Sequence, residues 1–221
     1  MYIVGWPGSQ NEILDERIPE VIFTPDVLDR FANLLMVVMR RQERMSEDGI
    51  RYCLFTSIRE RLGVGDAEIV IEHRHPKIKG VRLDCFLPAS PKHGAAVWEL
   101  KYDRAIPSGG NQPRSNKAGS LLNDFFRLAA VDEPQDLERI VIYLTDAEMA
   151  SYFRNPRNGL DALFDLGAGA KFRIDANLLA SRAPSVRNKI KVPVLPCYAV
   201  GKFATGLSAR NELRLWEVRL A

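Results

Sequence analysis

The chain has 221 residues, an apolar fraction of 46% and a formal net charge of +3, which fits one globular domain and permits an anionic partner without requiring one. The three cysteines are far apart and form no CxxC pair, which excludes a disulfide framework and a zinc ribbon. The longest apolar run, residues 34–39, is too short to span a membrane, and no signal-peptide pattern opens the chain. We therefore expect a soluble, cytoplasmic protein.

Two helices are predicted in the first part of the chain. The first, over 24–45, has Thr24 as N-cap and Pro25 at its first position, and its apolar stripe fits either a core or a dimer contact. That stripe consists of Val27, Phe31, Leu34, Leu35 and Val38. The second helix, over 46–63, has Ser46 as N-cap and ends at Gly63.

The next segment predicts a sheet. Three strands follow one another as an antiparallel meander, and after a turn-rich loop over 103–115 come a helix at 116–131 and a buried strand at 139–145. The three strands are 67–76, 81–87 and 95–102. The order of helix, three strands, helix and strand favours a mixed sheet with helices on its faces.

The remaining residues predict one or two short helices and a last pair of strands at 192–203 and 211–220. We accordingly divide the chain into three parts within one structural domain. These are an N-terminal helical extension (1–45), a core (46–145) and a C-terminal extension packed on that core (146–221).

Charged residues interrupt two of these apolar strands. Because side chains alternate along a strand, Glu99 and Lys101 share one face of 95–102, while Trp98 and Leu100 share the other. If 81–87 pairs with 95–102, Asp84 lies beside Glu99, and the two carboxylates repel each other. A hard divalent cation such as Mg²⁺ relieves that repulsion and binds phosphate, and a lysine beside it suits phosphodiester hydrolysis. We expect the two acids and the lysine to open on one cleft.

The pattern Asp84 … Glu99-Leu100-Lys101 resembles the PD-(D/E)XK nuclease superfamily over residues 46–145, with Leu83 in place of the proline of the motif. The resemblance implies a restriction endonuclease-like fold and a cytoplasmic enzyme that hydrolyses nucleic acid, with DNA as the expected substrate, in restriction, defence or repair. It implies Mg²⁺, with Mn²⁺ as a substitute, bound by Asp84, Glu99 and the Leu100 carbonyl. Lys101 then positions water or stabilises the transition state, and a homodimer is a further expectation.

Many members of this superfamily add an acid from the helix that precedes the sheet. On a helical wheel, Glu47 falls inside the apolar stripe of 46–63 and points toward the sheet, whereas Glu60 points toward water. Glu47 is therefore the candidate fourth member of the catalytic and metal-binding set. An equally good interpretation is a first-turn acid that only favours the helix dipole.

The helix at 116–131 has a polar flank that the resemblance places beside the active site. On that flank, Lys117 is the candidate for a phosphate contact, whereas Asp124 and Arg127 fit a solvated flank with an internal salt bridge better.

Residues 171–191 contain six basic residues and one acid, so Arg182, Arg187 and Lys189 are candidates for contacts with a nucleic-acid backbone. A basic surface loop explains this composition equally well. His73 and His75 have the spacing of two ligands on one strand face, but no third soft ligand is close, so we favour a structural role at the strand end over a zinc site.

Two other functional classes remain. One is a non-catalytic nucleic-acid-binding or regulatory protein that keeps the nuclease fold. The other is an unrelated α/β protein in which Asp84, Glu99 and Lys101 are surface charges of an edge strand.

Overall fold

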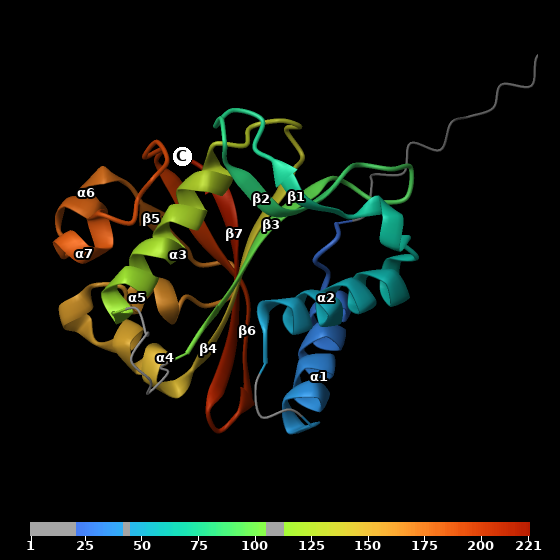
Figure 1. Cartoon of the computed structure of the whole chain (residues 1–221), viewed down its shortest axis with the longest axis horizontal. Coiled ribbons are helices and arrows are strands. Elements are labelled where there is room, and N and C mark those ends of the chain that lie inside the picture. The colour runs from blue at the N-terminus through green and yellow to red at the C-terminus, as the bar shows by residue number, and fades with distance from the viewer. Residues whose placement is uncertain (1–20, 42–44, 105–112) are drawn as a thin grey trace, which may run out of the picture.

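A computed structural model describes residues 21–41, 45–104 and 113–221 of the chain. Within them, seven strands form one sheet in the order β1-β2-β3-β4-β7-β6-β5 (Figure 1). Only β3 and β4 run parallel, whereas every other neighbouring pair is antiparallel. The strands are β1 (Val70–Arg74), β2 (Arg82–Leu87), β3 (Ala96–Asp103), β4 (Glu138–Asp146), β5 (Lys171–Ile174), β6 (Cys197–Ser208) and β7 (Asn211–Leu220).

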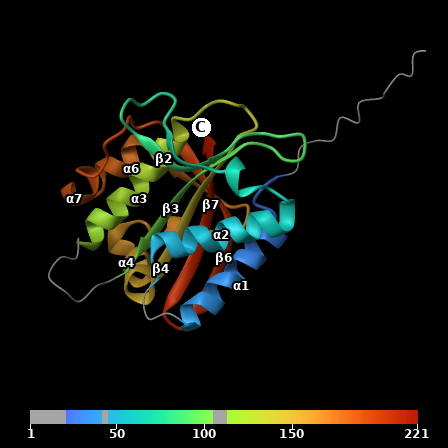
Figure 2. The same ribbon diagram turned by 45° about the vertical axis from the view of Figure 1, so that its right-hand side comes forward.

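Helices cover both faces of this sheet. Helices α1 (Pro25–Arg41) and α2 (Glu47–Leu62) lie on one face, and α3 (Arg114–Ala129) lies on the other with the short helices (Figures 1 and 2). The short helices are α4 (Ala147–Arg154), α5 (Asp161–Phe164), α6 (Ala176–Ala180) and α7 (Pro184–Arg187), and 3-10 turns occur at Asp66–Glu68 and Pro156–Asn158. Each face has its own hydrophobic core. The predicted mixed sheet with helices on its faces is confirmed.

The two N-terminal helices form for the reasons that their sequences indicate. The Ser46 hydroxyl accepts a hydrogen bond from the Gly49 N–H at 3.1 Å, and Gly63 ends α2 with a φ of 66°, which glycine adopts without strain. In α1, Val27, Phe31 and Leu35 are buried in the core, so the core interpretation of its stripe is confirmed. Residues 42–44 of the predicted first helix lie outside the described residues.

The predicted meander of three strands is confirmed, but several boundaries differ. Strand β6 begins at Cys197 rather than at residue 192, because Pro193 and Pro196 cannot donate to a ladder. Helix α3 begins at Arg114 and ends at Ala129. Of the predicted loop over 103–115, residues 105–112 lie outside the described residues.

The C-terminal part, residues 146–221, contains more helices and strands than the sequence predicted. Residues 171–191 are not a surface loop but contain β5, α6 and α7, and four short helices occur where one or two were expected. Strand β5 pairs with β6 over four residues, which is too short for a hydrophobic period to show. Residues 146–221 thus add three strands to the same sheet.

All three cysteines are buried free thiols. Among the residues that the structure describes, no helix combines the length and the apolar content that crossing a bilayer requires.

Candidate active site

The two strands that carry the predicted acids are paired. Strand β2 pairs with β3 through Cys85↔Trp98, Phe86↔Val97 and Leu87↔Ala96, and the next step of this register places Asp84 opposite Glu99. The ladder stops at that step, because the Asp84 carboxylate accepts the Leu100 N–H at 2.7 Å in place of a main-chain carbonyl. A carboxylate is therefore held at the point where β2 leaves β3.

The same hydrogen bond orients the main chain of Leu100. In a strand, the N–H and C=O groups of one residue point to the same side. The Leu100 carbonyl therefore faces the side on which Asp84 lies. The Leu100 side chain is buried with Trp98 in the core below α1 and α2, so both point away from Glu99, as the alternation predicted.

Glu99 is buried under α3 rather than open on a cleft. Its side chain is 1% exposed, and Arg127 of α3 donates to its carboxylate. Arg127 also contacts Asp124, one turn away, at 2.9 Å, and Asp124 is only 4% exposed. The internal salt bridge that we predicted in α3 thus exists, but the solvated flank was wrong. Helix α3 turns this pair toward the sheet, which also closes the predicted cleft over Glu99.

The carboxyl group of Glu99 is incompletely satisfied. Its Oε1 atom is buried and has no hydrogen-bond donor among the described residues, and the Nε of Arg127 likewise has no acceptor there. Burial raises the pKa of Glu99 well above its usual range, and the negative charges of Asp84 and Asp124 raise it further. Arg127 opposes this rise without cancelling it, so negative charge at this position is under-compensated.

Lys101 lies two residues further along the same face of β3. Its ammonium group contacts the Asp124 carboxylate at 3.1 Å. Burial alone lowers the pKa of Lys101, but the charges of Asp124 and Asp103 outweigh burial and the net shift is upward. Burial raises the pKa of Asp124 despite Lys101 and Arg127. Lys101 is therefore a fixed cation beside the acids.

Glu47 approaches from the other side, at the first position of α2. Its carboxylate accepts the N–H of Tyr102 at 3.2 Å. Burial raises the pKa of Glu47, the hydrogen bond and Lys101 lower it, and Asp84 raises it, so Glu47 lies within electrostatic reach of both. Glu60 lies at the other end of α2 and pairs with Arg30 of α1 at 2.6 Å. The structure thus brings Glu47, and not Glu60, to the other candidates, but Glu47 is exposed and does so from the first position of α2 rather than from the apolar stripe in which the helical wheel placed it.

The side chains described so far form one carboxylate cluster, which consists of Glu47, Asp84, Glu99, Lys101, Asp124 and Arg127. The rim of this cluster lies where β3 ends. Asp103 accepts a hydrogen bond from the buried Tyr143 hydroxyl at 3.1 Å. Burial raises the pKa of Asp103, and the charges of Lys101 and Lys117 lower it. Lys117 donates to the Arg104 carbonyl, so α3 is tied to the end of β3. Lys117 therefore stands at the rim, and its contact with phosphate stays a prediction.

His75 contacts the main chain of Arg127, a member of the cluster. Its Nδ1 accepts the N–H groups of Lys77 and Ile78 at 3.1 and 3.0 Å, which leaves Nε2 to donate to the Arg127 carbonyl at 2.9 Å. Burial lowers the pKa of His75, so the neutral ring is favoured. Both ring nitrogens are thus used within the protein, in agreement with the structural role that we favoured for this histidine.

The three predicted nucleic-acid contacts of residues 171–191 lie in and around the short helices α6 and α7. The Arg182 guanidinium donates to the main-chain carbonyls of Asn158 and Leu178, so it joins helix α6 to the 3-10 turn at Pro156–Asn158. Arg187 ends α7, which packs on α3, and Lys189 follows it. The roles of these three residues in binding nucleic acid stay predictions.

The residues of this cluster fit a hard divalent cation. No group of three or more His, Cys, Asp or Glu side chains forms a ready cage within the described ranges. Mg²⁺ does not require one, because it keeps several waters and uses one or two carboxylates. The unpaired oxygen of Glu99, the neighbouring Asp84 carboxylate and the orientation of the Leu100 carbonyl provide such a set. Acids also outnumber bases around them, which favours a bound cation.

Asp103, Asp124 and Arg127 belong to this cluster although the sequence did not assign them to it. The spacing of Lys117, Asp124 and Arg127 on one flank of α3 was the signal for two of them, but only packing shows that the flank faces β3. No protein-family model, curated protein or solved structure matches the chain. The arrangement of these side chains is therefore the basis on which the function is inferred.

Proposed function

We propose that this protein is a Mg²⁺-dependent nuclease of the PD-(D/E)XK type that hydrolyses phosphodiester bonds, with DNA as its expected substrate. The observation that carries the proposal is the buried, donor-free Oε1 of Glu99, which lies beside Asp84 and on the same strand face as Lys101. An unsatisfied buried acceptor costs about 1–3 kcal/mol, and a bound cation beside Glu99 and Asp84 would remove that cost.

Asp84, Glu99 and the Leu100 carbonyl would hold the ion, and Glu47 would complete the set from α2. When bound, the ion polarises a phosphoryl oxygen and lowers the pKa of a coordinated water. Lys101 orients the attacking water or stabilises the charge that develops on the phosphate. Asp124 keeps the Lys101 ammonium in place at 3.1 Å.

Arg127 has a separate role in this proposal. Its guanidinium contacts both Glu99 and Asp124, two almost fully buried carboxylates, and partly compensates their charge. Arg127 would compete with a bound cation for the negative charge of Glu99, because its guanidinium already contacts that carboxylate.

One assay tests the activity. The purified protein is incubated with DNA and RNA, single- and double-stranded, in Mg²⁺, in Mn²⁺ and in chelator. We expect cleavage that chelator abolishes and that Glu99→Gln eliminates. Glu60→Gln is the matched control, because Glu60 is exposed and pairs with Arg30 away from the cluster. Equal cleavage by wild type and Glu99→Gln would exclude the assigned site.

A second candidate function, nucleic-acid binding without catalysis, has one observation in its favour. Arg127 already supplies a positive charge to Glu99, so the cluster is held together without any ion. Under this alternative, the protein retains nucleic acid but neither cleaves it nor binds Mg²⁺ in calorimetry. Binding of Mg²⁺ by the wild type and its loss in Glu99→Gln would exclude the alternative.

A further inference from the structure

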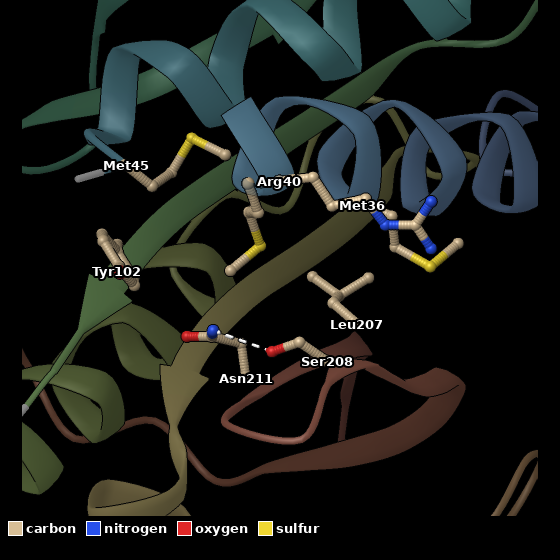
Figure 3. A pocket seen from close by; sticks show the side chains of 8 residues that line it. Met36, Arg40, Met45, Tyr102, Leu207, Ser208 and Asn211 are labelled. Atoms are coloured by element: carbon tan, nitrogen blue, oxygen red, sulfur yellow. Dashed lines mark hydrogen bonds between the residues drawn. The ribbon is translucent and has the colours of Figure 1, made fainter. Parts of the chain in front are cut away.

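Figure 3 shows a hollow of about 360 Å³ that Tyr102 of β3 lines. Because side chains alternate along a strand, it lies on the opposite face of β3 from Glu99 and Lys101. It is bounded by the C-terminal half of α1, by Met45 just before the N-cap of α2, by the end of β3 and by the β6–β7 hairpin where the two strands meet their turn. Its lining residues are Met36, Met39, Arg40, Met45, Tyr102, Leu207, Ser208 and Asn211. Its volume is in the range of sites for small molecules.

The hollow shares its walls with the carboxylate cluster. Tyr102 lines it and directly follows Lys101 in β3, so the two side chains point to opposite faces of one strand. The Tyr102 N–H donates to Glu47, and Met45 lies two residues before Glu47. A chain of nucleotides that crosses the end of β3 would therefore meet both places.

The walls combine polarizable apolar groups with few polar ones. Three methionines and Leu207 supply the apolar surface, and methionine adapts its shape to flat rings and contacts them favourably. On the turn, Asn211 Nδ2 donates to Ser208 Oγ at 3.1 Å, which leaves the Asn211 carbonyl oxygen directed away from Ser208 as an acceptor (Figure 3). Arg40 is exposed, and no hydrogen bond or ion pair joins it to a residue that the structure describes.

These features select a ligand class. A purely apolar ligand leaves Arg40 and Asn211 unused, and a metal ion finds no carboxylate among the lining residues. A flat heteroaromatic ring with an attached anion would use all of them. The ring would contact the apolar walls, its hydrogen-bonding edge would meet Asn211, and the anion would meet Arg40. A base in a duplex is excluded, because its hydrogen-bonding edge is occupied by the partner base and the stacked neighbouring bases keep it from entering the hollow.

We propose that the hollow binds one unpaired base of a nucleic-acid strand, with the adjacent phosphate toward Arg40. This inference rests on the proposed nuclease function, whose substrate it narrows to nucleic acid with a single-stranded segment. The base lies between the methionines and Tyr102, and its edge donates to Asn211.

The test measures binding in chelator, where no cleavage occurs, with a fluorescein-labelled single-stranded oligonucleotide and the matching duplex. Met36→Glu places a carboxylate in the hollow and should weaken single-strand binding about tenfold, the value of one stacked base, while duplex binding stays unchanged. A single strand that contains 2-aminopurine should change its emission on binding to wild type and not on binding to Met36→Glu.

Arg40→Gln tests the phosphate contact at an exposed position, without any change to the core. It should lower the slope of log K against log salt for the single strand by about 0.7. Arg41→Gln, the next residue of α1 and not part of the lining, is the matched control and should keep the slope. Equal losses for strand and duplex, equal effects of Arg40→Gln and Arg41→Gln, or a constant 2-aminopurine emission would overturn the proposal.

The two proposals fail separately. If the wild type cleaves no substrate in Mg²⁺ while the single-strand signals hold, the nuclease function is wrong and the base site stands. If cleavage occurs and Met36→Glu binds single strands as the wild type does, the base site alone is wrong.

Discussion

Arg127 of α3 donates to the carboxylate of Glu99 on β3, and this contact joins the helix to the strand that carries the candidate catalytic residues. The guanidinium occupies the space beside an acid whose other oxygen has no donor among the described residues. The contact is therefore both a structural link and a competitor for any cation at Glu99.

Replacement of Arg127 tests this double role. In the absence of metal, Arg127→Met should lower the free energy of unfolding by about 3 kcal/mol, because it leaves buried carboxylates without their partner. The same variant should bind Mg²⁺ more tightly than wild type, since the competing charge is gone. Urea unfolding with and without Mg²⁺ and calorimetry measure the two effects.

Arg154→Met is the matched control for Arg127→Met. Arg154 pairs with Glu212 and Asp165 at the surface, so its removal should cost at most about 1 kcal/mol and leave Mg²⁺ binding unchanged. Weaker Mg²⁺ binding in Arg127→Met than in wild type would contradict the competition.

Glu99→Gln should abolish cleavage and leave the fold intact. The amide keeps the shape of the side chain but removes the charge that a cation requires, and burial favours a neutral group at this position. Circular dichroism and urea unfolding check the fold, and nuclease assays in Mg²⁺ check activity. Undiminished cleavage by a well-folded variant would refute the metal-site assignment.

Lys101→Ala should slow turnover while Mg²⁺ binding persists, because an ammonium group is not a metal ligand. Its partner Asp124 keeps the contact with Arg127 at 2.9 Å, so the variant should still fold. Calorimetry and single-turnover cleavage separate the two effects. A fall in Mg²⁺ affinity as large as in Glu99→Gln would show that the division of roles is wrong.

Of the basic residues after α6, Arg187 and Lys189 should contribute to the salt dependence of nucleic-acid binding, because they are not bound to main-chain carbonyls as Arg182 is. Neutralising Arg187 and Lys189 together should lower the slope of log K against log salt by about 0.9 for each duplex DNA phosphate that these side chains neutralise in the wild type. Arg182 is left unchanged, since its guanidinium is bound to main-chain carbonyls. The slope is measured by fluorescence anisotropy at several salt concentrations. An unchanged slope would show that Arg187 and Lys189 do not contact phosphate.

His75 should make the protein acid-sensitive. Burial lowers the pKa of His75 below its usual 6.5, so the folded state holds the neutral ring. Above pH 6.5 the ring is neutral in both states and its contribution to stability is fully present. As the pH falls below 6.5 the unfolded state binds the proton first, and stability is lost by up to about 1.4 kcal/mol per pH unit until the folded pKa is passed.

Urea unfolding at a series of pH values between 7.5 and 5 measures this loss (the range brackets the unperturbed value of about 6.5). His75→Gln keeps a hydrogen-bonding side chain but does not titrate, so its stability should depend less on pH over this range. Equal pH dependence of wild type and His75→Gln would show that His75 does not contribute.

Local patterns in the sequence were enough to predict the central elements. The alternation along 95–102 separated Glu99 and Lys101 from Trp98 and Leu100, and the structure places the latter two in the opposite core. This prediction succeeded because a period of two residues fixes the direction of a side chain within one strand, without reference to any other element. The helical wheel favoured Glu47 over Glu60, but both are exposed, and Glu47 meets β3 because it begins α2.

The contacts between elements depended on the tertiary structure. Nothing within α3 shows that Asp124 and Arg127 face β3, because the rotation of a helix on a sheet is set by the packing of its whole apolar face. The hollow is made by α1, β3 and the turn between β6 and β7, which meet only after the sheet is assembled. Sequence alone thus determined which acids and bases share a strand face, whereas packing decided which groups from other elements cover them.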